Sequence, residues 1–286
     1  MTKRRAALYG VLLVILSVGA VGLGTRLGYW SYLAPHVPAS VAMHDDYLHY
    51  TFAIPGTLYE AGSPEESTSP YWWLNSGGHM ILRDGVGMTI QGPLPEQHRW
   101  HKKYATADPL DTDNGFYPQN LFRLISRHTW NDVSVEASFR IQNDNLSESP
   151  NRNESNGLLL MARYLDDDNL YYAGLRVDGA AVIKKKRYGT YYQLGYTQIY
   201  EGSYNRSGTS NLLPHQEWLR LRLEVTDVPE GVLLRLSLFE EGSWREILSA
   251  IDKGVHDVPT ISEPGFIGIR TDFMDVEFDS VVVSER

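Results

Sequence analysis

The stretch VSVEASFRI, residues 133–141, decides the fold class. Apolar residues occupy every second position from Val133 to Ile141, and polar residues from Ser134 to Arg140 fill the positions between them. Successive side chains of a β-strand point to opposite faces of its sheet, so the stretch predicts a strand with one buried face and one polar face.

Similar short stretches follow along the chain, and turn residues such as Asp178-Gly179 and Tyr188-Gly189 separate them. The candidate strands cover residues 158–165, 170–177, 180–187, 190–194, 218–225, 232–239, 243–251, 265–271 and 275–284. Consecutive strands with tight turns are typical of antiparallel sheets. No segment after residue 30 carries a convincing helical pattern. The sequence therefore predicts an all-β, two-sheet antiparallel jelly-roll sandwich.

The composition excludes several classes of protein. The chain has 286 residues, 35 Asp and Glu against 26 Lys and Arg, and no cysteine. A disulfide framework is therefore excluded. A net charge of −9 disfavours a general nucleic-acid binder, because duplex affinity depends on neutralising phosphates.

The first 25 residues predict one N-terminal transmembrane or signal helix. Three basic residues, 3–5, precede a mostly apolar, uncharged segment, residues 6–24. A cleaved signal peptide and an uncleaved membrane anchor both remain open, and the anchor is favoured by the length of the segment. A buried core helix is the remaining alternative. Either one exports the rest of the chain, with the N-terminus in the cytoplasm for an anchor. Residues 26–46 then form a linker, and residues 47–286 form the domain.

Two long polar segments interrupt the strands. Residues 142–156 lack aromatic residues, which predicts disorder. Residues 199–216 contain Tyr200 and Tyr204, so a ligand-binding loop and a plain connecting loop are both open. Four tryptophans cluster in the N-terminal part of the chain, at positions 72, 73, 100 and 130. We expect them to pack in the core, and a platform that stacks on sugar rings is the alternative.

Alternation along the strands predicts a basic, tyrosine-bearing face. Glu136 lies on this face with the other polar residues of 134–140. If neighbouring strands contribute to the same face, further side chains lie beside them. These candidate ligand-binding residues are Arg140, Arg163, Tyr172, Arg176 and Lys184 or Lys186. Arginine forks suit carboxylates or sulfates and tyrosine faces suit sugar rings, so an anionic glycan would fit this face. A solvated convex face is the alternative.

Four segments resemble a known superfamily. They are DNLYYAGLRVDGAAVIKKKRYGTYYQLG (168–195), HQEWLRLRLEV (215–225), FEEGSWREIL (239–248) and PGFIGIRTDFMDVEFDSVVV (264–283). Together they resemble the concanavalin A-like lectin/glucanase superfamily, specifically its laminin G-like jelly rolls, found as sugar-binding modules and 3-keto-disaccharide-hydrolase-type domains. The resemblance spans about residues 115–284, and it implies two antiparallel sheets, one with a concave face that receives a carbohydrate chain.

The catalytic motifs of this superfamily are not matched. The E-x-D-x-x-E strand of family 16 glucanases is absent, with Glu277-Phe-Asp279 as the nearest fragment. Tyr200 stands where the Gln-Ile-His strand of alginate-lyase-type jelly rolls has its histidine. We therefore expect a polysaccharide-binding protein that does not cleave its ligand. A polysaccharide lyase or glycoside hydrolase and an envelope assembly protein stay open. For the enzyme alternative, the candidate catalytic residues are Glu136, Tyr172 and Arg176.

The resemblance also implies a structural Ca²⁺ ion. Jelly rolls of this superfamily often hold one with an Asp on the last strand, where Asp279 lies, and Asp272 and Asp275 are candidate helpers. Carboxylate and carbonyl oxygens are the ligands that Ca²⁺ takes. That Asp279 only caps a turn or pairs with an arginine is the alternative. The expected partners are a polysaccharide and, through the N-terminal helix, a membrane, but no nucleic acid.

Overall fold

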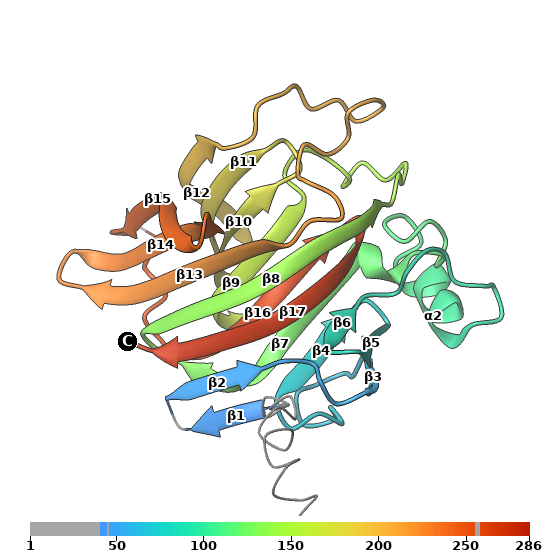
Figure 1. Ribbon diagram of the computed structural model, residues 1–286, viewed down its shortest axis with the longest axis horizontal. Coiled ribbons are helices and arrows are strands. Elements are labelled where there is room, and N and C mark those ends of the chain that lie inside the picture. Colours follow the sequence, from blue (N-terminus) through green and yellow to red (C-terminus); the bar gives the residue numbers. More distant parts are fainter. Residues whose placement is uncertain (1–40, 45, 255–257) are drawn as a thin grey trace, which may run out of the picture. The chain divides into compact units, whose positions relative to one another are not determined.

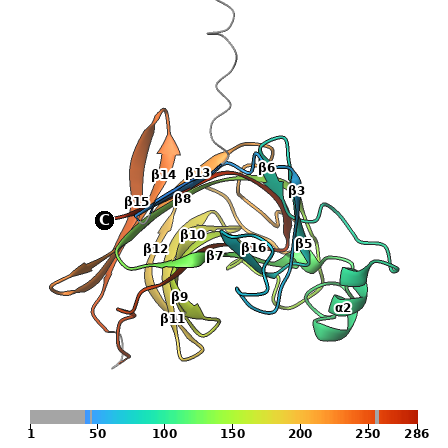
Figure 2. The same ribbon diagram turned by 90° about the horizontal axis from the view of Figure 1, so that it is seen from below.

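The computed structural model describes residues 41–44, 46–254 and 258–286, and two antiparallel β-sheets form most of this part of the chain. Figure 2 shows the sheets as two stacked layers. The all-β, two-sheet antiparallel architecture predicted from the sequence is thus confirmed. The predicted N-terminal helix, residues 1–25, lies outside the described residues.

The larger sheet has ten strands, in the order β15-β14-β13-β8-β17-β6-β5-β3, with β2 and β1 joined to it through β17. Its strands are β1 (Val41–His44), β2 (Tyr47–Tyr50), β3 (Gly56–Tyr59), β5 (His79–Arg83), β6 (Val86–Met88), β8 (Val133–Asp144), β13 (Leu219–Val228), β14 (Gly231–Glu240), β15 (Ser243–Asp252) and β17 (Met274–Glu285).

The smaller sheet has seven strands, in the order β12-β11-β10-β9-β16-β7-β4. They are β4 (Trp72–Ser76), β7 (Leu121–Trp130), β9 (Gly157–Asp166), β10 (Asn169–Arg176), β11 (Ala180–Arg187), β12 (Thr190–Gln198) and β16 (Gly265–Asp272). Strands β9 to β12 follow one another as hairpins, as the turn residues predicted.

The alternation in residues 133–141 is confirmed by β8. Its apolar side chains from Val133 to Ile141 are fully buried in the core between the sheets. Strand β8 pairs with β13 on one side and β17 on the other.

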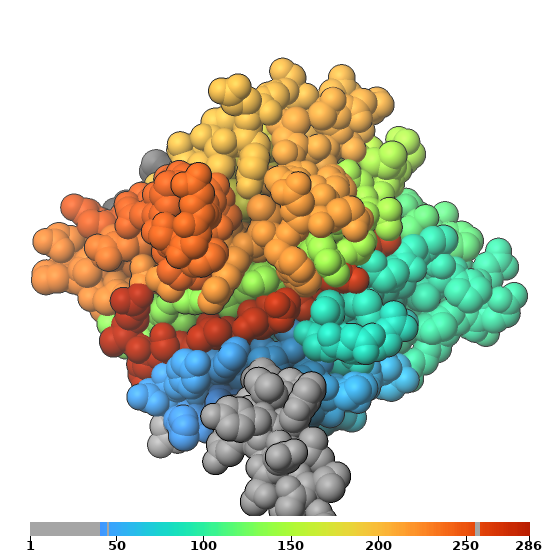
Figure 3. Space-filling model, viewed as in Figure 1, coloured from blue at the N-terminus to red at the C-terminus, as the bar shows by residue number. Residues whose placement is uncertain are grey.

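The last strand, β17, joins the N-terminal strands to the rest of the larger sheet. It pairs along its length with β8, and its other edge pairs with β2 and β6. Figures 1 and 3 show this arrangement, with β17 in red between β8 in green and β2 in blue. Strand β1 extends the sheet beyond β2 and includes residues from the end of the predicted linker.

The prediction of no helix after residue 30 was wrong. Helix α2 (Arg99–Ala107) lies at one end of the sandwich, near β3 and β5 (Figures 1 and 2). It buries Trp100 and Tyr104, and the imidazole of His98 caps it by accepting from the Trp100 amide. A helix of only nine residues gives too few turns for a clear periodic pattern. A short 3-10 helix, Pro118–Asn120, precedes β7.

The tryptophans of the N-terminal part are packed in the interior, as the favoured interpretation held. Trp72 and Trp130 lie in the main core. Trp73 points to the opposite face of β4 and packs in a second cluster, while Trp100 packs in a third beside α2. No helix within the described ranges is long and apolar enough to span a membrane.

Candidate functional site

The outer face of the seven-stranded sheet carries its own buried layer. Leu159, Met161, Tyr172 and Val182 point away from the main core and cluster together with little exposed area. Strand alternation explains this, because the neighbours of these residues fill the core on the other side. Among the described residues, no second sheet covers this outer face, so its surroundings there are long side chains and loops. Such a surface can present apolar atoms beside polar groups.

A groove runs over this layer. It consists of two cavities of about 400 Å³ and about 140 Å³, and both are lined by Tyr172, Tyr191 and Arg270. Sharing these three residues makes the cavities neighbours. We name the two together the sheet groove. The larger one lies within the range of volumes typical of ligand sites.

Two tyrosines from different strands form the middle of the sheet groove. The rings of Tyr172 on β10 and Tyr191 on β12 meet edge to face, with centroids 6.1 Å apart. Tyr172 is buried, whereas Tyr191 is 49% exposed. Burial raises the pKa of the Tyr172 hydroxyl, which stays protonated at neutral pH. Tyr172 is therefore a poor candidate for a general base, while the pair offers ring surface to a ligand.

Four cationic side chains line the sheet groove, and three of them are paired. Arg270 donates to Asp272 Oδ1 at 2.8 Å. Arg123 pairs with Asp167, and Lys186 lies 3.0 Å from Asp168. The fourth cation is Lys184.

Lys184 has no ion pair or hydrogen bond within the part of the chain that the structure describes. Its ammonium lies 6.0 Å from the centre of the Tyr172 ring. Burial, with the charges of Arg176 and Arg270, lowers the pKa of Lys184. A bound anion would offset both effects.

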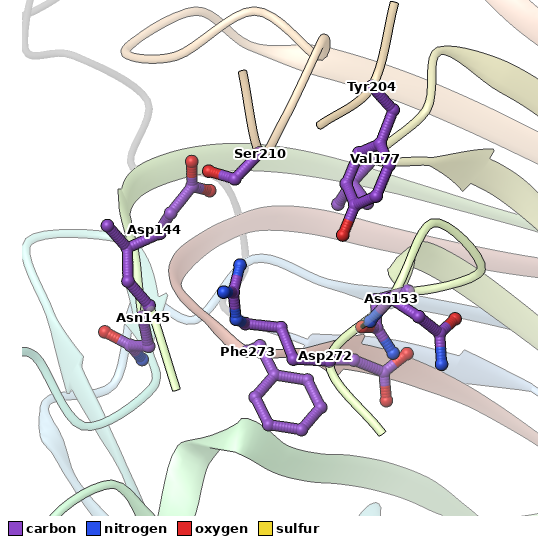
Figure 4. A pocket seen from close by; sticks show the side chains of 11 residues that line it. Asp144, Asn145, Asn153, Val177, Tyr204, Ser210, Asp272 and Phe273 are labelled. Carbon is purple, nitrogen blue, oxygen red and sulfur yellow. Dashed lines mark hydrogen bonds between the residues drawn. The ribbon is translucent and has the colours of Figure 1, made fainter. Parts of the chain in front are cut away.

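Asp272 is 3% exposed and lines the larger cavity of the sheet groove. Its Oδ2 atom has no hydrogen-bond partner. Asp272 also lines a small cavity of about 10 Å³, shown in Figure 4, where the ring of Tyr204 ends in a hydroxyl without a partner. That volume fits about one water molecule.

The segment after β8 forms a polar wall of the sheet groove. Asn151, Asn153 and Ser155 line the larger cavity, and Asp111 accepts from the Asn151 side chain. The prediction of disorder for residues 142–156 was wrong. The segment buries the side chain of Arg152, which donates to the Ser147 carbonyl and so secures the loop without an aromatic residue.

Several predicted residues do lie at or beside the sheet groove. Tyr172 and Lys184 line it. Arg176, next along the same face of β10, is bound to Asp178 at 2.7 Å. Tyr204 lines the small cavity next to Asp272, while Tyr200 packs against the main core.

Glu136 and Arg140 lie on the other sheet. Glu136 accepts from Arg220 at 2.7 Å and from Arg222 at 2.8 Å, and Arg140 pairs with Glu277. The expectation that these residues share a face with Tyr172 and Lys184 was wrong, because β8 belongs to the ten-stranded sheet. Alternation fixes which face of a strand a residue occupies, but it does not say which sheet holds the strand.

Arg163 is fully buried and lies outside the sheet groove. Its guanidinium donates to Asp227 at 2.8 Å, to Asp132 at 3.0 Å and to the Ile261 carbonyl at 2.8 Å. These bonds tie β9 to β13 of the other sheet, to the turn between β7 and β8 and to the loop before β16, so Arg163 has a structural role.

The three carboxylates predicted to hold calcium occupy different environments. Asp279 lies on β17, where burial raises its pKa, and Asp272 is engaged by Arg270. Asp275 accepts from Gly92 N, Gln119 and Asn145. Within the described residues, no three His, Cys, Asp or Glu side chains form a group that could hold a metal ion. A calcium ion bound largely by carbonyls near Asp279 stays a prediction.

Sequence reasoning missed Tyr191 and Arg270. Both have a signal in the sequence, since each lies at an alternate position of a strand candidate, in GTYYQLG and in GFIGIRTD. What was missing is the strand order, which brings β12 and β16 to the same face of one sheet.

The chain is similar in structure to several solved proteins. It matches the carbohydrate-binding module CBM66 from Bacillus subtilis at 14% identity and a TM-score of 0.40, over 58% of this chain and 82% of that one. A winged bean acidic lectin, complexed with methyl-α-D-galactose, matches at 12% identity and 0.45, over 80% and 97%. A prokaryotic β-1,3-1,4-glucanase (lichenase) from a mouse hindgut metagenome matches at 10% and 0.43, over 84% and 100%.

These three solved structures have the concanavalin A-like jelly-roll fold, the superfamily that the sequence resembles. No protein-family model matches the chain, and no curated protein matches it in sequence. The low identities and TM-scores leave the function to be inferred from the sheet groove itself.

Proposed function

We propose that the protein binds a polysaccharide in the sheet groove and does not cleave it. The observation that carries the proposal is the Tyr172–Tyr191 pair at the junction of two adjoining cavities. Sugar rings have apolar C–H faces that pack on aromatic rings, and hydroxyls that bond to the polar groups around them. Two cavities in series suit successive units of a chain better than a single sugar.

The polar groups of the sheet groove support binding of hydroxyl-rich ligands. Carboxylates at Asp111, Asp167 and Asp272 accept hydrogen bonds, and the Asn151 and Asn153 amides both donate and accept. Small-molecule sites commonly combine aromatic rings with a few polar groups of this kind. The volume of the two cavities and the exposure of Tyr191 leave the groove accessible to a long ligand.

The same groups argue against cleavage. Glycoside hydrolysis requires two carboxyl groups facing one bond, one of them free to give a proton. Here Asp167 is paired with Arg123 and Asp272 with Arg270. The third carboxylate, Asp111, accepts from the Ser149 and Asn151 side chains. A lyase would need a base that loses its proton readily, whereas burial raises the pKa of Tyr172.

Affinity electrophoresis of the purified full-length chain tests the proposal. The gels contain neutral or acidic polysaccharides, and wild type is compared with Tyr191→Ala. Tyr59→Ala is the matched control, since Tyr59 is similarly exposed but lies on the other sheet. We expect at least one polysaccharide to retard wild type and Tyr59→Ala, and to retard Tyr191→Ala less.

Two outcomes would contradict the proposal. If no polysaccharide retards the wild-type chain, the sheet groove does not serve polysaccharide binding. If the polysaccharide gains reducing ends or unsaturated ends during incubation, the protein is a hydrolase or a lyase, the alternative that the sequence left open.

The membrane and calcium predictions remain as secondary proposals. We propose that residues 1–25 direct the domain out of the cytoplasm, on the strength of their sequence pattern alone. Protease treatment of intact cells tests this, because an exported domain is cut and a cytoplasmic one is protected. Calcium is tested by thermal unfolding, in which a bound ion makes the melting temperature fall on addition of EDTA.

A further inference from the structure

Lys184 is the cation of the sheet groove that the described residues leave without an anion. The three other cations that line it are each paired with a carboxylate, namely Arg123, Lys186 and Arg270. Just outside the lining, Arg176 is paired with Asp178. A lysine at the wall of a cavity, partly withdrawn from water, is stabilised by an anion that enters with the ligand.

The surroundings of Lys184 reinforce this requirement. Two guanidinium groups, those of Arg176 and Arg270, lie close enough to lower its pKa together with burial. Each of them has its own aspartate partner. The carboxylates of Asp178 and Glu154 act on the pKa of Lys184 in the opposite direction, but neither forms an ion pair with it. The Lys184 ammonium therefore has no direct anionic partner among the described residues.

Asp272 holds one of the other cations of the same cavity in place. It is 3% exposed, and its Oδ1 accepts from Arg270. Its Oδ2 is buried beyond the reach of a ligand in the groove. The larger cavity thus presents to a ligand one cation that lacks an anion, beside an arginine that already has one.

We propose that the sheet groove selects acidic sugars, with the anionic substituent bound to the Lys184 ammonium. This inference rests on the proposed polysaccharide-binding function and specifies its ligand class. Carboxylate and sulfate groups share the required chemistry. The single ammonium of lysine acts as a point charge and accepts either one, without the bidentate fork that arginine would impose.

Isothermal titration with matched oligosaccharides tests the inference. The probes are oligomers of galacturonate, mannuronate and hyaluronan, each with its carboxyl-reduced counterpart, and chondroitin sulfate with its desulfated form. Lys184→Met is compared with wild type and with Lys102→Met, a lysine exposed on α2 away from the groove. Lys184→Gln provides a second variant, and circular dichroism checks the fold of all variants.

Wild type should bind at least one acidic oligomer about tenfold or more tighter than its neutral counterpart. Lys184→Met and Lys184→Gln should lose about tenfold in affinity for that oligomer, which is about 1.4 kcal/mol, and less than about twofold for the neutral one, because only the acidic oligomer loses its charged partner. Lys102→Met should bind as wild type does. Whether the carboxylated or the sulfated oligosaccharides bind more tightly shows which of the two anionic groups Lys184 contacts.

Three results would overturn the inference, and they separate it from the proposed function. Equal affinity for acidic and neutral oligomers would contradict the selectivity while leaving polysaccharide binding intact. Unchanged acidic-oligomer affinity in both Lys184 variants would exclude Lys184 as the contact. Failure of every oligomer to bind, together with failure of every polysaccharide to retard the chain, would contradict both proposals.

Discussion

The ammonium of Lys185 lies 2.8 Å from a carboxylate oxygen of Asp252, and both side chains are fully buried. Lys185 belongs to β11 of the smaller sheet and Asp252 ends β15 of the larger one. The Tyr171 hydroxyl also donates to Asp252, at 2.6 Å, and Lys185 donates to the Val258 and Pro259 carbonyls. The pair therefore joins the two sheets through a fully hydrogen-bonded ionic contact.

Breaking this pair from one side should be costly. Lys185→Met leaves the Asp252 carboxylate buried without its cation, and we expect a loss of about 3–5 kcal/mol in the free energy of unfolding. The double variant Lys185→Met/Asp252→Leu should be less destabilised than the single one, because it leaves no buried charge. Urea unfolding measures both. A single variant as stable as wild type would contradict the role of the pair.

Gly174 should not tolerate a side chain. A Cβ atom at this position on β10 would lie 2.0 Å from the Leu158 carbonyl oxygen of β9, so the strands would have to separate. We expect Gly174→Ala to lose about 1–3 kcal/mol or more. Gly208→Ala is the matched control, since the nearest atom to its Cβ is 3.7 Å away, and it should change stability by about 0.5 kcal/mol or less. Equal effects of the two substitutions would disprove the tight approach of β9 and β10.

His79 should make the protein less stable as the pH falls. Burial, with the neighbouring His98 and Arg99, lowers the pKa of His79 to about 4. An imidazole in the unfolded chain titrates near pH 6.5. Between about pH 6.5 and pH 4 the unfolded chain thus holds a proton that the folded chain lacks, and stability decreases as pH decreases through this window.

The test compares melting temperatures at pH 7 and pH 5. The decrease should be smaller in His79→Gln than in wild type, and unchanged in His128→Gln, where the imidazole is exposed. Identical decreases in all three proteins would show that His79 does not contribute.

The strands could be predicted well because alternation is a local property. Residues 133–141 carry the pattern of β8 without help from the rest of the chain, and residues around Asp178-Gly179 mark a hairpin. Helix α2 was missed because most of its stability comes from packing Trp100 and Tyr104 against other segments, which no local pattern reports.

The sheet groove could be predicted only in part. Tyr172 and Lys184 were identified from composition and alternation, and both line it. Arg270 comes from β16, 98 residues after Tyr172, and its place beside Tyr172 depends on how β16 and β10 both flank β9. The prediction that Glu136 shares a face with Tyr172 and Lys184 was wrong for the same reason, because the tertiary fold decides which sheet a strand joins.

We propose that polysaccharide binds on the outer face of the seven-stranded sheet. Hydrogen–deuterium exchange of the full-length chain, with and without a retarding polysaccharide, tests this most directly. We predict slower exchange in residues 145–156, the polar wall, and in the edge strand β12, with no change in β13 and β14. Protection of β13 and β14 without protection of residues 145–156 and β12 would contradict the account, because the ligand would then lie on the other sheet.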